Sequence, residues 1–516
     1  MGKKKRAGEM PPAAETRVAK QARRTETMCE QLVTDNIYKG TVMQEYLIWA
    51  WTKLSEQEQR MARSAVMDST SSLSTSCSGS GMTEVAHDML IRSLGGTPYL
   101  SHSCEMIGFK REHLMQTVHT AVQAERACCF HEFGELSRGM ARCAVHNQLC
   151  RVDFSAHLAV IGYSCKDMSS LKHGSKKDVL ASRTGSSGST CQHLIAYLHA
   201  AKTKVVILEN VPEMAKEEHQ SENVRYLAEA ARAAGYELCT RLLDAQEFML
   251  PQRRKRAWTV LLQKEALGLS SAESQRVLHA IFQTVENLKT RPIAAKKLLL
   301  KTGDGALEAE LRRRQVNQYE TNYYTHILPL ESYHELHQTF LSRKGVSWAQ
   351  LRALPSTEES AWFQLAPPRE KDIIAFAMKH KPDLTSVDCS QRIDRCTMTV
   401  KGILPTILPN AKLFLGFFPG MGGRPLNRFI LGVESLAFQG FPVELLARTA
   451  ANTSDRQYQD LAGNAFPSTC LLAIMLAMLV HVPPPSLGDT QPDAPDSQAS
   501  LASGADSLID FLGGVV

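Results

Sequence analysis

Four side chains in the middle of the chain have types that could work together chemically. Cys165 supplies a thiol, Glu209 a carboxyl group, and Arg254 and Arg256 supply guanidinium groups. A thiolate is strongly nucleophilic near neutral pH, so Cys165 could attack an electrophilic carbon and form a covalent intermediate. A buried carboxylic acid can assist such an attack, and guanidinium groups hold oxygen atoms with fixed donors. These residue types predict a catalytic site with Cys165 as the nucleophile.

The elements around these residues must bring them together. One apolar run, at 157–162, ends just before the thiol, and a second, at 204–208, ends at the carboxyl residue. A helix-like stretch at 190–201 lies between the runs, after a Gly/Ser-rich loop at 184–188. Strand, helix and strand in that order form a crossover unit whose two strands are parallel. Because ligands bind beyond the carboxyl ends of parallel strands, we expect the thiol and the carboxyl group at one edge of the sheet.

A third passage brings the arginines to the same edge. We expect a helix at 225–234, a strand at 236–243 and a return strand at 256–262. If the strand at 236–243 is also parallel, the return strand starts at the edge that holds the thiol, and the basic segment 251–256 lies there too. Alternating strands and helices predict an α/β fold with a mixed, mostly parallel sheet.

The length and local composition predict two folded domains with flanking tails. The arm and the tail have the composition of disordered segments, and alternation fades between the two parts of the core. The expected parts are a basic disordered N-terminal arm (1–35), a catalytic core (36–265), a second, smaller domain (266–425), a C-terminal part of the core that ends in an apolar helix (426–482) and a disordered tail (483–516).

The basic arm has two short runs of positive charge, Lys3–Arg6 and Lys20–Arg24. Such runs serve as nuclear-import signals or bind phosphates, and the alternative is a solubilising tail. We expect a nuclear protein. The net charge of +6 is compatible with a polyanionic partner but is shared by many other proteins.

The cysteines and the apolar runs exclude several classes of protein. The N-terminus has no apolar stretch after its basic residues, so it is no signal peptide, and we expect the 13 cysteines to be reduced thiols in an intracellular protein. No C-x-x-C pair is matched by a second pair at zinc-finger spacing, so we expect no metal site. The apolar run at 470–482 is too short to cross a bilayer comfortably, so we expect no membrane partner.

A series of segments, in order from residue 72 to 480, resembles the C5-cytosine methyltransferases. In that family a Gly-containing loop, an acid after the second strand, a nucleophile loop, a Glu-Asn-Val triplet, a Gln-x-Arg-x-Arg segment, a segment before the last motif and a Gly-Asn motif follow one another. No single segment is specific, whereas the ordered set is. The corresponding segments here are Cys77–Gly81, Ser103–Met106, Ser164–Ser169, Glu209–Val211, Gln252–Arg256, Glu434–Pro442 and Gly463–Phe466.

The resemblance implies a Rossmann-like S-adenosylmethionine-dependent core with a target-recognition domain at 266–425. The implied reaction is methylation of cytosine C5 in DNA: Cys165 adds to C6 of a flipped base, Glu209 hydrogen-bonds N3, and Arg254 and Arg256 hold the base oxygen and a nearby phosphate.

The resemblance also implies residues for S-adenosylmethionine. The first loop would approach the methionine part, Glu105 the ribose hydroxyls and Glu132 the adenine, while the Gly-Asn motif would line the pocket. The residues expected to bind the cofactor are Ser78, Gly79, Ser80, Gly81, Glu105, Met106, Glu132, Asn464 and Ala465.

The nucleophile loop departs from the family pattern. Ser164 stands where the family has proline, which loosens the loop, and Lys166 stands where it has glutamine. Lys166 places a cation next to the thiol in sequence, and we hypothesise that this cation favours the thiolate. The first loop also lacks the Asp-Leu-Phe run that precedes the glycines in the family.

Several alternatives remain open at this point. The chain could methylate cytosine in RNA, or bind nucleic acid or partner proteins without catalysis, and a nicotinamide oxidoreductase ranks below both. Individual residues also have structural alternatives: Cys165 as a buried thiol, Glu209 as a helix cap, the arginines as surface charges, and Asn464 as the cap of the helix that follows it. The sequence indicates no protein partner.

Overall fold

The computed structural model describes residues 38–67, 71–168, 178–324, 333–347, 360–419, 425–448 and 453–482. The predicted arm at 1–35 lies outside the described residues, as does the predicted tail at 483–516, and both stay predictions. Ser169, at the end of the nucleophile loop, is also outside them.

A nine-stranded sheet forms the centre of the core, in the order β5-β4-β3-β2-β1-β6-β7-β9-β8. Strands β1, β2, β3, β6 and β7 pair in parallel, and β4 and β9 run antiparallel to their neighbours. The strands are β1 (Ser71–Ser76), β2 (Pro98–Cys104), β3 (Cys128–Phe130), β4 (Met140–Cys143), β5 (Gln148–Arg151), β6 (Leu158–Ile161), β7 (Val205–Asn210), β8 (Tyr236–Asp244) and β9 (Lys255–Gln263). The mixed, mostly parallel Rossmann-like sheet is confirmed.

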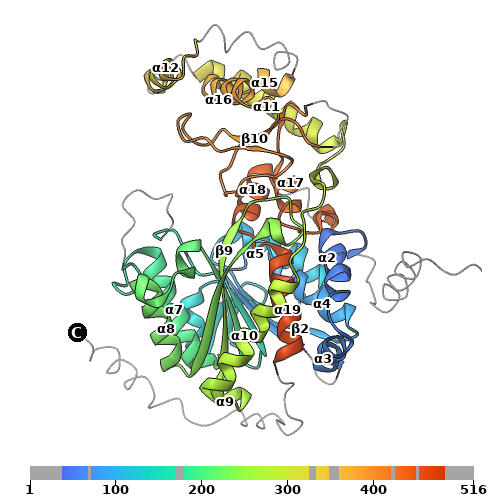
Figure 1. Ribbon diagram of the computed structural model, residues 1–516, viewed down its shortest axis with the longest axis vertical. Coiled ribbons are helices and arrows are strands. Elements are labelled where there is room, and N and C mark those ends of the chain that lie inside the picture. The colour runs from blue at the N-terminus through green and yellow to red at the C-terminus, as the bar shows by residue number, and fades with distance from the viewer. Residues whose placement is uncertain are drawn as a thin grey trace, which may run out of the picture. The chain divides into compact units, whose positions relative to one another are not determined.

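Helices cover both faces of this sheet (Figure 1). On one face α7 (Gly185–Ala201) and α8 (Glu222–Ala233) pack with Phe130, Val206 and Tyr236. The other face carries α2 (Val42–Trp51), α3 (Glu56–Met67), α4 (Met82–Ser93), α10 (Ser271–Asn287) and α19 (Ser468–His481). Polar caps fix where some of these helices begin: Ser221 accepts from Val224 N at the start of α8, and Ser270 forms a capping box with Glu273 at the start of α10.

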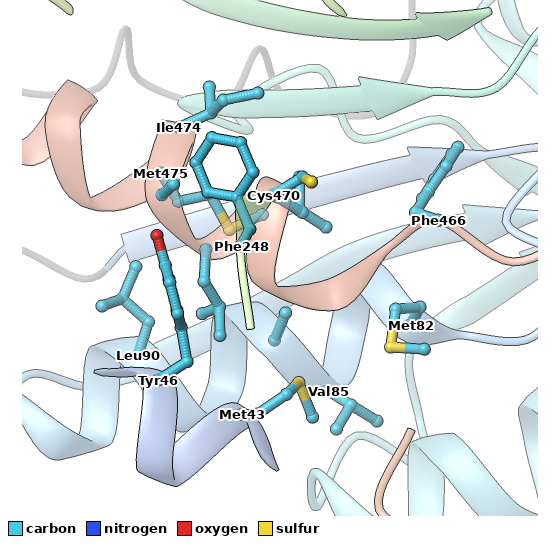
Figure 2. Packing of buried hydrophobic residues seen from close by; sticks show 14 of the residues in the cluster. Met43, Tyr46, Met82, Val85, Leu90, Phe248, Phe466, Cys470, Ile474 and Met475 are labelled. Atoms are coloured by element: carbon cyan, nitrogen blue, oxygen red, sulfur yellow. The ribbon is translucent and has the colours of Figure 1, made fainter. Parts of the chain in front are cut away.

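The apolar helix α19 belongs to the hydrophobic cluster on this second face of the sheet. Figure 2 shows Cys470, Ile474 and Met475 of α19 gathered with Tyr46 of α2 and with Phe248. Residues Asp455–His481 are long and apolar enough to cross a membrane by length and composition, but 89% of the 18-residue window tested within them is buried inside the protein. A helix that is apolar all round is expected when it is buried on all sides, so this hydrophobicity is explained by the core.

The predicted crossover unit is confirmed in its strands and corrected in its loop. The predicted strands at 157–162 and 204–208 correspond to β6 and β7, which pair in parallel. The predicted loop at 184–188 is wrong, because α7 begins at Gly185 with Thr184 as its N-cap. The return strand β9 is antiparallel to β7, which brings its first residues to the carboxyl ends of the parallel strands.

A separate group of elements follows the core. A four-stranded sheet has the order β11-β10-β12-β13, and Leu341, Phe376, Val387 and Phe429 belong to a hydrophobic cluster of their own. The elements are α11 (Gly305–Tyr324), α12 (His334–Arg343), α15 (Ala361–Gln364), α16 (Pro368–His380), β10 (Leu384–Asp388), β11 (Met398–Val400), β12 (Leu413–Leu415) and β13 (Arg428–Phe429).

The predicted boundary at 266 needs correction. Helix α10 packs against α19 and β8, and its Leu278, Ile281 and Val285 are buried in the cluster that contains α19. The core therefore extends through α10. The remaining short elements are α5 (Gly108–His113), the π-helix Leu114–His119, α6 (Phe133–Leu136), α9 (Lys264–Leu267), α17 (Gly432–Ala437) and α18 (Asp455–Asn464), with 3-10 turns at Pro212–Ala215, Glu218–Gln220, Ala245–Glu247, Ala295–Leu298 and Val443–Arg448.

Candidate active site

Cys165 lies in the loop that leaves the carboxyl end of β6, and its side chain is partly exposed. Asn210, the last residue of β7, holds this loop: its Nδ2 donates to the carbonyl of Tyr163 at 3.2 Å, and its Oδ1 accepts from Val211 N at 2.8 Å. Asn210 is 3% exposed, so these bonds are shielded from water. The asparagine of the Glu-Asn-Val triplet thus positions the loop that carries the nucleophile.

Asp167 attaches the same loop to the N-terminus of α7. Its Oδ2 accepts from Ser187 N at 3.0 Å and from Ser186 Oγ at 3.2 Å, and its own N–H donates to Ser187 Oγ at 3.0 Å. Ser164 Oγ lies 3.2 Å from Ser186 Oγ. A carboxylate is favourable at a helix N-terminus, where backbone N–H groups lack partners. These bonds restrain a loop that lacks the proline expected there.

Glu209 and Arg256 form an ion pair beside this loop. Arg256 Nε lies 3.0 Å from Glu209 Oε1, and the two side chains are 15% and 12% exposed. Oε1 is buried and makes no hydrogen bond of good geometry, so its contact with Arg256 is mainly a charge interaction. Neither the helix-cap reading of Glu209 nor the surface reading of Arg256 fits this arrangement.

The charges around Cys165 are coupled. Burial raises the pKa of Cys165, the Glu209 carboxylate raises it further, and Arg256 and Arg254 lower it. Burial also raises the pKa of Glu209, against the lowering effect of Arg256 and Arg254. The predicted thiol, acid and guanidinium groups are therefore brought into one electrostatic neighbourhood. The cations that favour the thiolate are the two arginines, whereas the Lys166 side chain is exposed.

The sequence predicted that Arg254 holds the base, but the structure gives it other partners. It is 2% exposed, and its terminal nitrogens donate to the carbonyls of Ile407 (2.9 Å), Gly463 (3.1 Å) and Ala465 (2.8 Å). Burial, followed by the charge of Arg256, lowers its pKa to about 9. Gln252 also binds this segment, because its Oε1 accepts a hydrogen bond from Ile407 N at 3.0 Å. Both residues tie the start of β9 to other segments, and Arg256 is the arginine that faces the site.

The Gly-Asn motif lies where these segments meet. A Cβ at Gly463 would come within 2.1 Å of the Pro409 nitrogen, so only glycine allows this close approach. Asn464 is the last residue of α18 and donates from Nδ2 to the Asp460 carbonyl at 2.8 Å. The N-cap of α19 is Pro467, so the reading of Asn464 as a cap of the following helix is wrong.

The predicted cofactor loop follows β1 at the same edge. Gly79 and Gly81 have φ values of 58° and 72°, and Gly81 is the N-cap of α4 without a side-chain hydrogen bond. Glu105 is 7% exposed and accepts from Gly79 N at 3.1 Å and from Ile107 N at 3.0 Å. A Cβ at Gly79 would lie 3.7 Å from Asn464 Cβ, so the first and last motifs adjoin.

The remaining predicted cofactor residues have varied surroundings. Ser78 and Ser80 are buried, Met106 is 62% exposed, and Glu132, the N-cap of α6, is exposed. Burial, and then the charges of Glu105 and Glu132, raise the pKa of Cys77 to about 12. Ala465 contributes its carbonyl to Arg254. A cavity of about 600 Å³ lies at the opposite end of β2 and β3, and no catalytic candidate lines it.

Sequence reasoning missed the roles of Asp167, Ser187 and Asn210. Asn210 stands in a segment that the sequence singled out, and its position next to Glu209 at a strand end was a usable signal. The role of Asp167 depends on where α7 begins, and the serine-rich start of that helix resembled a loop.

Residues 151–479 match the sequence profile of a family described as C-5 cytosine-specific DNA methylase. The matched segment contains the nucleophile loop, Glu209, the arginines and the Gly-Asn motif, and it begins after the cofactor loop, at the last residue of β5. No curated protein matches the sequence.

Three similar solved structures are described as methyltransferases. The S. pombe Dnmt2 methyltransferase has 12% identity and a TM-score of 0.42, over 80% of this chain and 98% of that one. The Entamoeba histolytica methyltransferase EhMeth has 9% identity and a TM-score of 0.41 over the same shares, 80% and 98%. A putative DNA modification methyltransferase encoded within an E. coli prophage has 12% identity and a TM-score of 0.41, again over 80% and 98%.

Proposed function

The chain belongs to the C-5 cytosine-specific DNA methylase family, and we propose that it methylates C5 of cytosine in DNA through a covalent adduct with Cys165. The observation that carries the proposal is the juxtaposition of a partly exposed thiol, a buried carboxyl group with a raised pKa and an arginine paired with that carboxyl group. The core has the Rossmann-like fold of S-adenosylmethionine-dependent methyltransferases.

Each residue of this cluster has a role in activating the base. The Cys165 thiolate adds to C6, which moves electron density towards N3 and makes C5 nucleophilic. Glu209 in its protonated form donates to N3, which its raised pKa favours. Arg256 stabilises the thiolate and orients the Glu209 carboxyl group. Because these atoms are inaccessible in a duplex, the base must be flipped out of the stack.

The loop after β1 fits S-adenosylmethionine, which would supply the methyl group for C5. The first turn of α4 has no side-chain cap, so its backbone N–H groups suit an anionic group such as the amino-acid carboxylate. Glu105 uses two of its four acceptor positions on backbone N–H groups and keeps others for hydroxyl groups. Asn464 adjoins this loop, and we assign it and Glu132, whose charge acts on Cys77, to the same pocket.

We take DNA as the substrate because the basic arm can neutralise phosphates and the second sheet with its helices offers a domain for target recognition. We also propose that the basic runs of the arm direct the protein to the nucleus. Loss of nuclear accumulation of a fluorescent fusion after replacement of Lys3–Arg6 by alanine would support this assignment, and unchanged accumulation after replacement of both basic runs would contradict it.

Trapping with 5-fluorocytosine tests nucleophile, base and activity together. After methyl transfer the fluorine at C5 cannot leave as a proton does, so the enzyme stays bound to the oligonucleotide. We expect a covalent complex with duplex DNA in the presence of S-adenosylmethionine, its loss in Cys165→Ala, and its retention in Cys239→Ala, a partly buried thiol on β8.

The same assay separates the alternatives. Methyl transfer and trapping with tRNA but not with duplex DNA would replace the DNA assignment by an RNA one. If neither nucleic acid is trapped and Cys165→Ala behaves like the wild-type protein in binding, the chain is a non-catalytic nucleic-acid-binding member of the family.

A further inference from the structure

Four side chains at the β5 edge of the large sheet converge on one point. Cys128 is the first residue of β3, Cys143 the last of β4, His146 lies in the turn that follows, and Cys150 lies in β5. The three Sγ atoms and one ring nitrogen of the histidine all lie within 4.8 Å of one another. We call these residues the Cys3His cluster.

Strand register explains why the side chains meet. In the antiparallel pair β4–β5, Ala141 lies opposite Cys150 and Cys143 opposite Gln148, so the two cysteines are diagonal neighbours on one face. Phe130 of β3 lies opposite Cys143, and extending this register puts Cys128 on the same face, one diagonal step away. The turn at 144–147, with its left-handed Asn147 (φ 52°), brings the histidine back over this face.

The distances within the cluster point to a shared central atom. His146 Nδ1 lies 3.5 Å from Cys128 Sγ, 3.4 Å from Cys143 Sγ and 3.5 Å from Cys150 Sγ. A single ring nitrogen carries at most one hydrogen, so it cannot donate to three sulfurs at once. A tetrahedral zinc ion with Zn–S of about 2.3 Å and Zn–N of about 2.05 Å requires sulfur and nitrogen to be about 3.6 Å apart. The observed spacing therefore fits tetrahedral coordination.

We propose that the Cys3His cluster binds a structural zinc ion. Three thiolates and one imidazole form a recognised structural zinc set, and the four protein ligands leave no open position for a substrate. Soft sulfur ligands in tetrahedral geometry disfavour magnesium, calcium and manganese, which prefer oxygen ligands. Cys143 is fully buried, and the exposed imidazole of His146 closes the site towards solvent.

The ion would fasten a weak edge of the sheet. Strands β4 and β5 have four residues each, and a short hairpin has little stability of its own. The ligands come from three strands, so one ion cross-links the hairpin to β3. Through β4 the hairpin also holds the segment after β3, since Arg142 O accepts from His131 N at 3.1 Å and Arg142 N donates to Glu135 Oε2 at 3.1 Å. That segment contains Glu132, so loss of zinc should weaken the cofactor pocket indirectly.

The expectation of no metal site depended on paired C-x-x-C motifs, and this cluster has none. Its spacing is C-x14-C-x2-H-x3-C, with one ligand from the preceding strand β3. The four residues also precede the segment that matches the family profile, which begins at residue 151. Nothing in the proposed methylation requires the ion, so this inference stands apart from the proposed function.

Metal analysis of the untagged full-length protein, purified without chelators, tests the proposal. We expect about one zinc ion per chain, and X-ray absorption at the zinc edge should show three sulfur neighbours at about 2.3 Å and one nitrogen at about 2.05 Å. Cys143→Ser and Cys150→Ser should lose most of the zinc. Cys239→Ser, which removes a partly buried thiol on β8, should keep it.

A second variant guards against misfolding of the cysteine mutants. His146→Ala removes an exposed ligand and should fold, but it should release zinc to a chromophoric chelator at lower chelator concentrations than the wild-type protein does. Protein without bound zinc, an iron–sulfur cluster in its place, a disulfide within the cluster in the intact mass, or equal zinc retention by all variants would overturn the proposal.

Discussion

Cys165 and Glu209 share one electrostatic environment, so their protonation must be treated as a pair. Burial raises the pKa of both groups, the Glu209 carboxylate raises that of Cys165 further, and Arg256 and Arg254 lower both. The reactive form has a thiolate and a protonated carboxyl group, and it carries the same number of protons as a thiol with a carboxylate. Activity should therefore have a bell-shaped pH profile. The two apparent pKa values of this profile are properties of the pair and not of either residue alone.

Arg256→Ala should move the ascending limb of this profile to higher pH. The arginine lowers the pKa of both groups, so its removal raises both, and an adjacent charge of this kind is worth about 1–3 pH units. Steady-state rates of methyl transfer at saturating DNA across pH provide the measurement. Arg256→Lys keeps the positive charge and should hold the limb close to the wild-type position. Equal limbs in the alanine variant and the wild-type protein would show that Arg256 does not set the protonation of the pair.

Arg254→Ala should act on stability before it acts on chemistry. The variant leaves the carbonyls of Ile407, Gly463 and Ala465 without their charged donor, and each unpaired buried group costs about 1–3 kcal/mol, so we expect a loss on the order of 3 kcal/mol or more. Urea unfolding followed by circular dichroism measures it. The neighbouring exposed Arg253→Ala should stay within about 0.5 kcal/mol of the wild-type protein. Equal unfolding midpoints for both variants would show that the hydrogen bonds of Arg254 to the three carbonyls do not stabilise the fold.

At the level of elements, the sequence predicts strands better than it predicts contacts. The apolar runs of β6 and β7 and the return strand β9 were recognisable because burial on both faces demands continuous apolar residues. The start of α7 was not recognisable, because its Gly/Ser-rich first turn is stabilised by Asp167 from another loop. The helix α10 was not predicted, because the alternation of strands and helices fades after residue 265.

Asp167→Ala should reduce turnover more than its effect on stability explains. The carboxylate both caps α7 and holds the nucleophile loop, so its loss should cost about 0.5–2 kcal/mol as an N-cap and displace the thiol. Because small misplacements of reacting groups are costly, we expect kcat to fall roughly tenfold to a hundredfold. Asp167→Asn keeps an acceptor oxygen and should recover part of the rate.

Ser221→Ala is the matched control for this helix cap. Ser221 caps α8 in the same way, by accepting from Val224 N, but it has no contact with the nucleophile loop among the described residues. The control should lose similar stability and keep its kcat. If Asp167→Ala and Ser221→Ala lose turnover equally, the effect of Asp167 is only that of a destabilised fold.

At the scale of the whole molecule, contacts between segments limit what the sequence can predict, because the sequence shows the residues but not which of them meet. The parallel pairing of β6 and β7 and the order of the motifs could be predicted, because the carboxyl ends of parallel strands meet at one edge of a sheet. The boundary at 266 was not predictable, because it depends on which distant segments pack together. The Cys3His cluster was not, because it depends on the register of three neighbouring strands. The close approach of Gly463 to Pro409 is of the same kind: the glycine is visible in the sequence, and its partner is not.

Deletion of residues 1–35 should weaken the salt dependence of DNA binding while the chemical step persists. The arm carries the basic runs Lys3–Arg6 and Lys20–Arg24, whereas the described catalytic residues all lie beyond it. For every phosphate that the arm no longer neutralises, the slope of log K against log salt concentration should fall by about 0.9, and kcat at saturating DNA should stay near the wild-type value. Fluorescence anisotropy over a series of salt concentrations measures the slope. Deletion of 484–516, a segment without lysine or arginine, should leave the slope unchanged. Equal slopes for the two truncations would remove the arm from the DNA-binding surface and leave that role to the folded part of the chain.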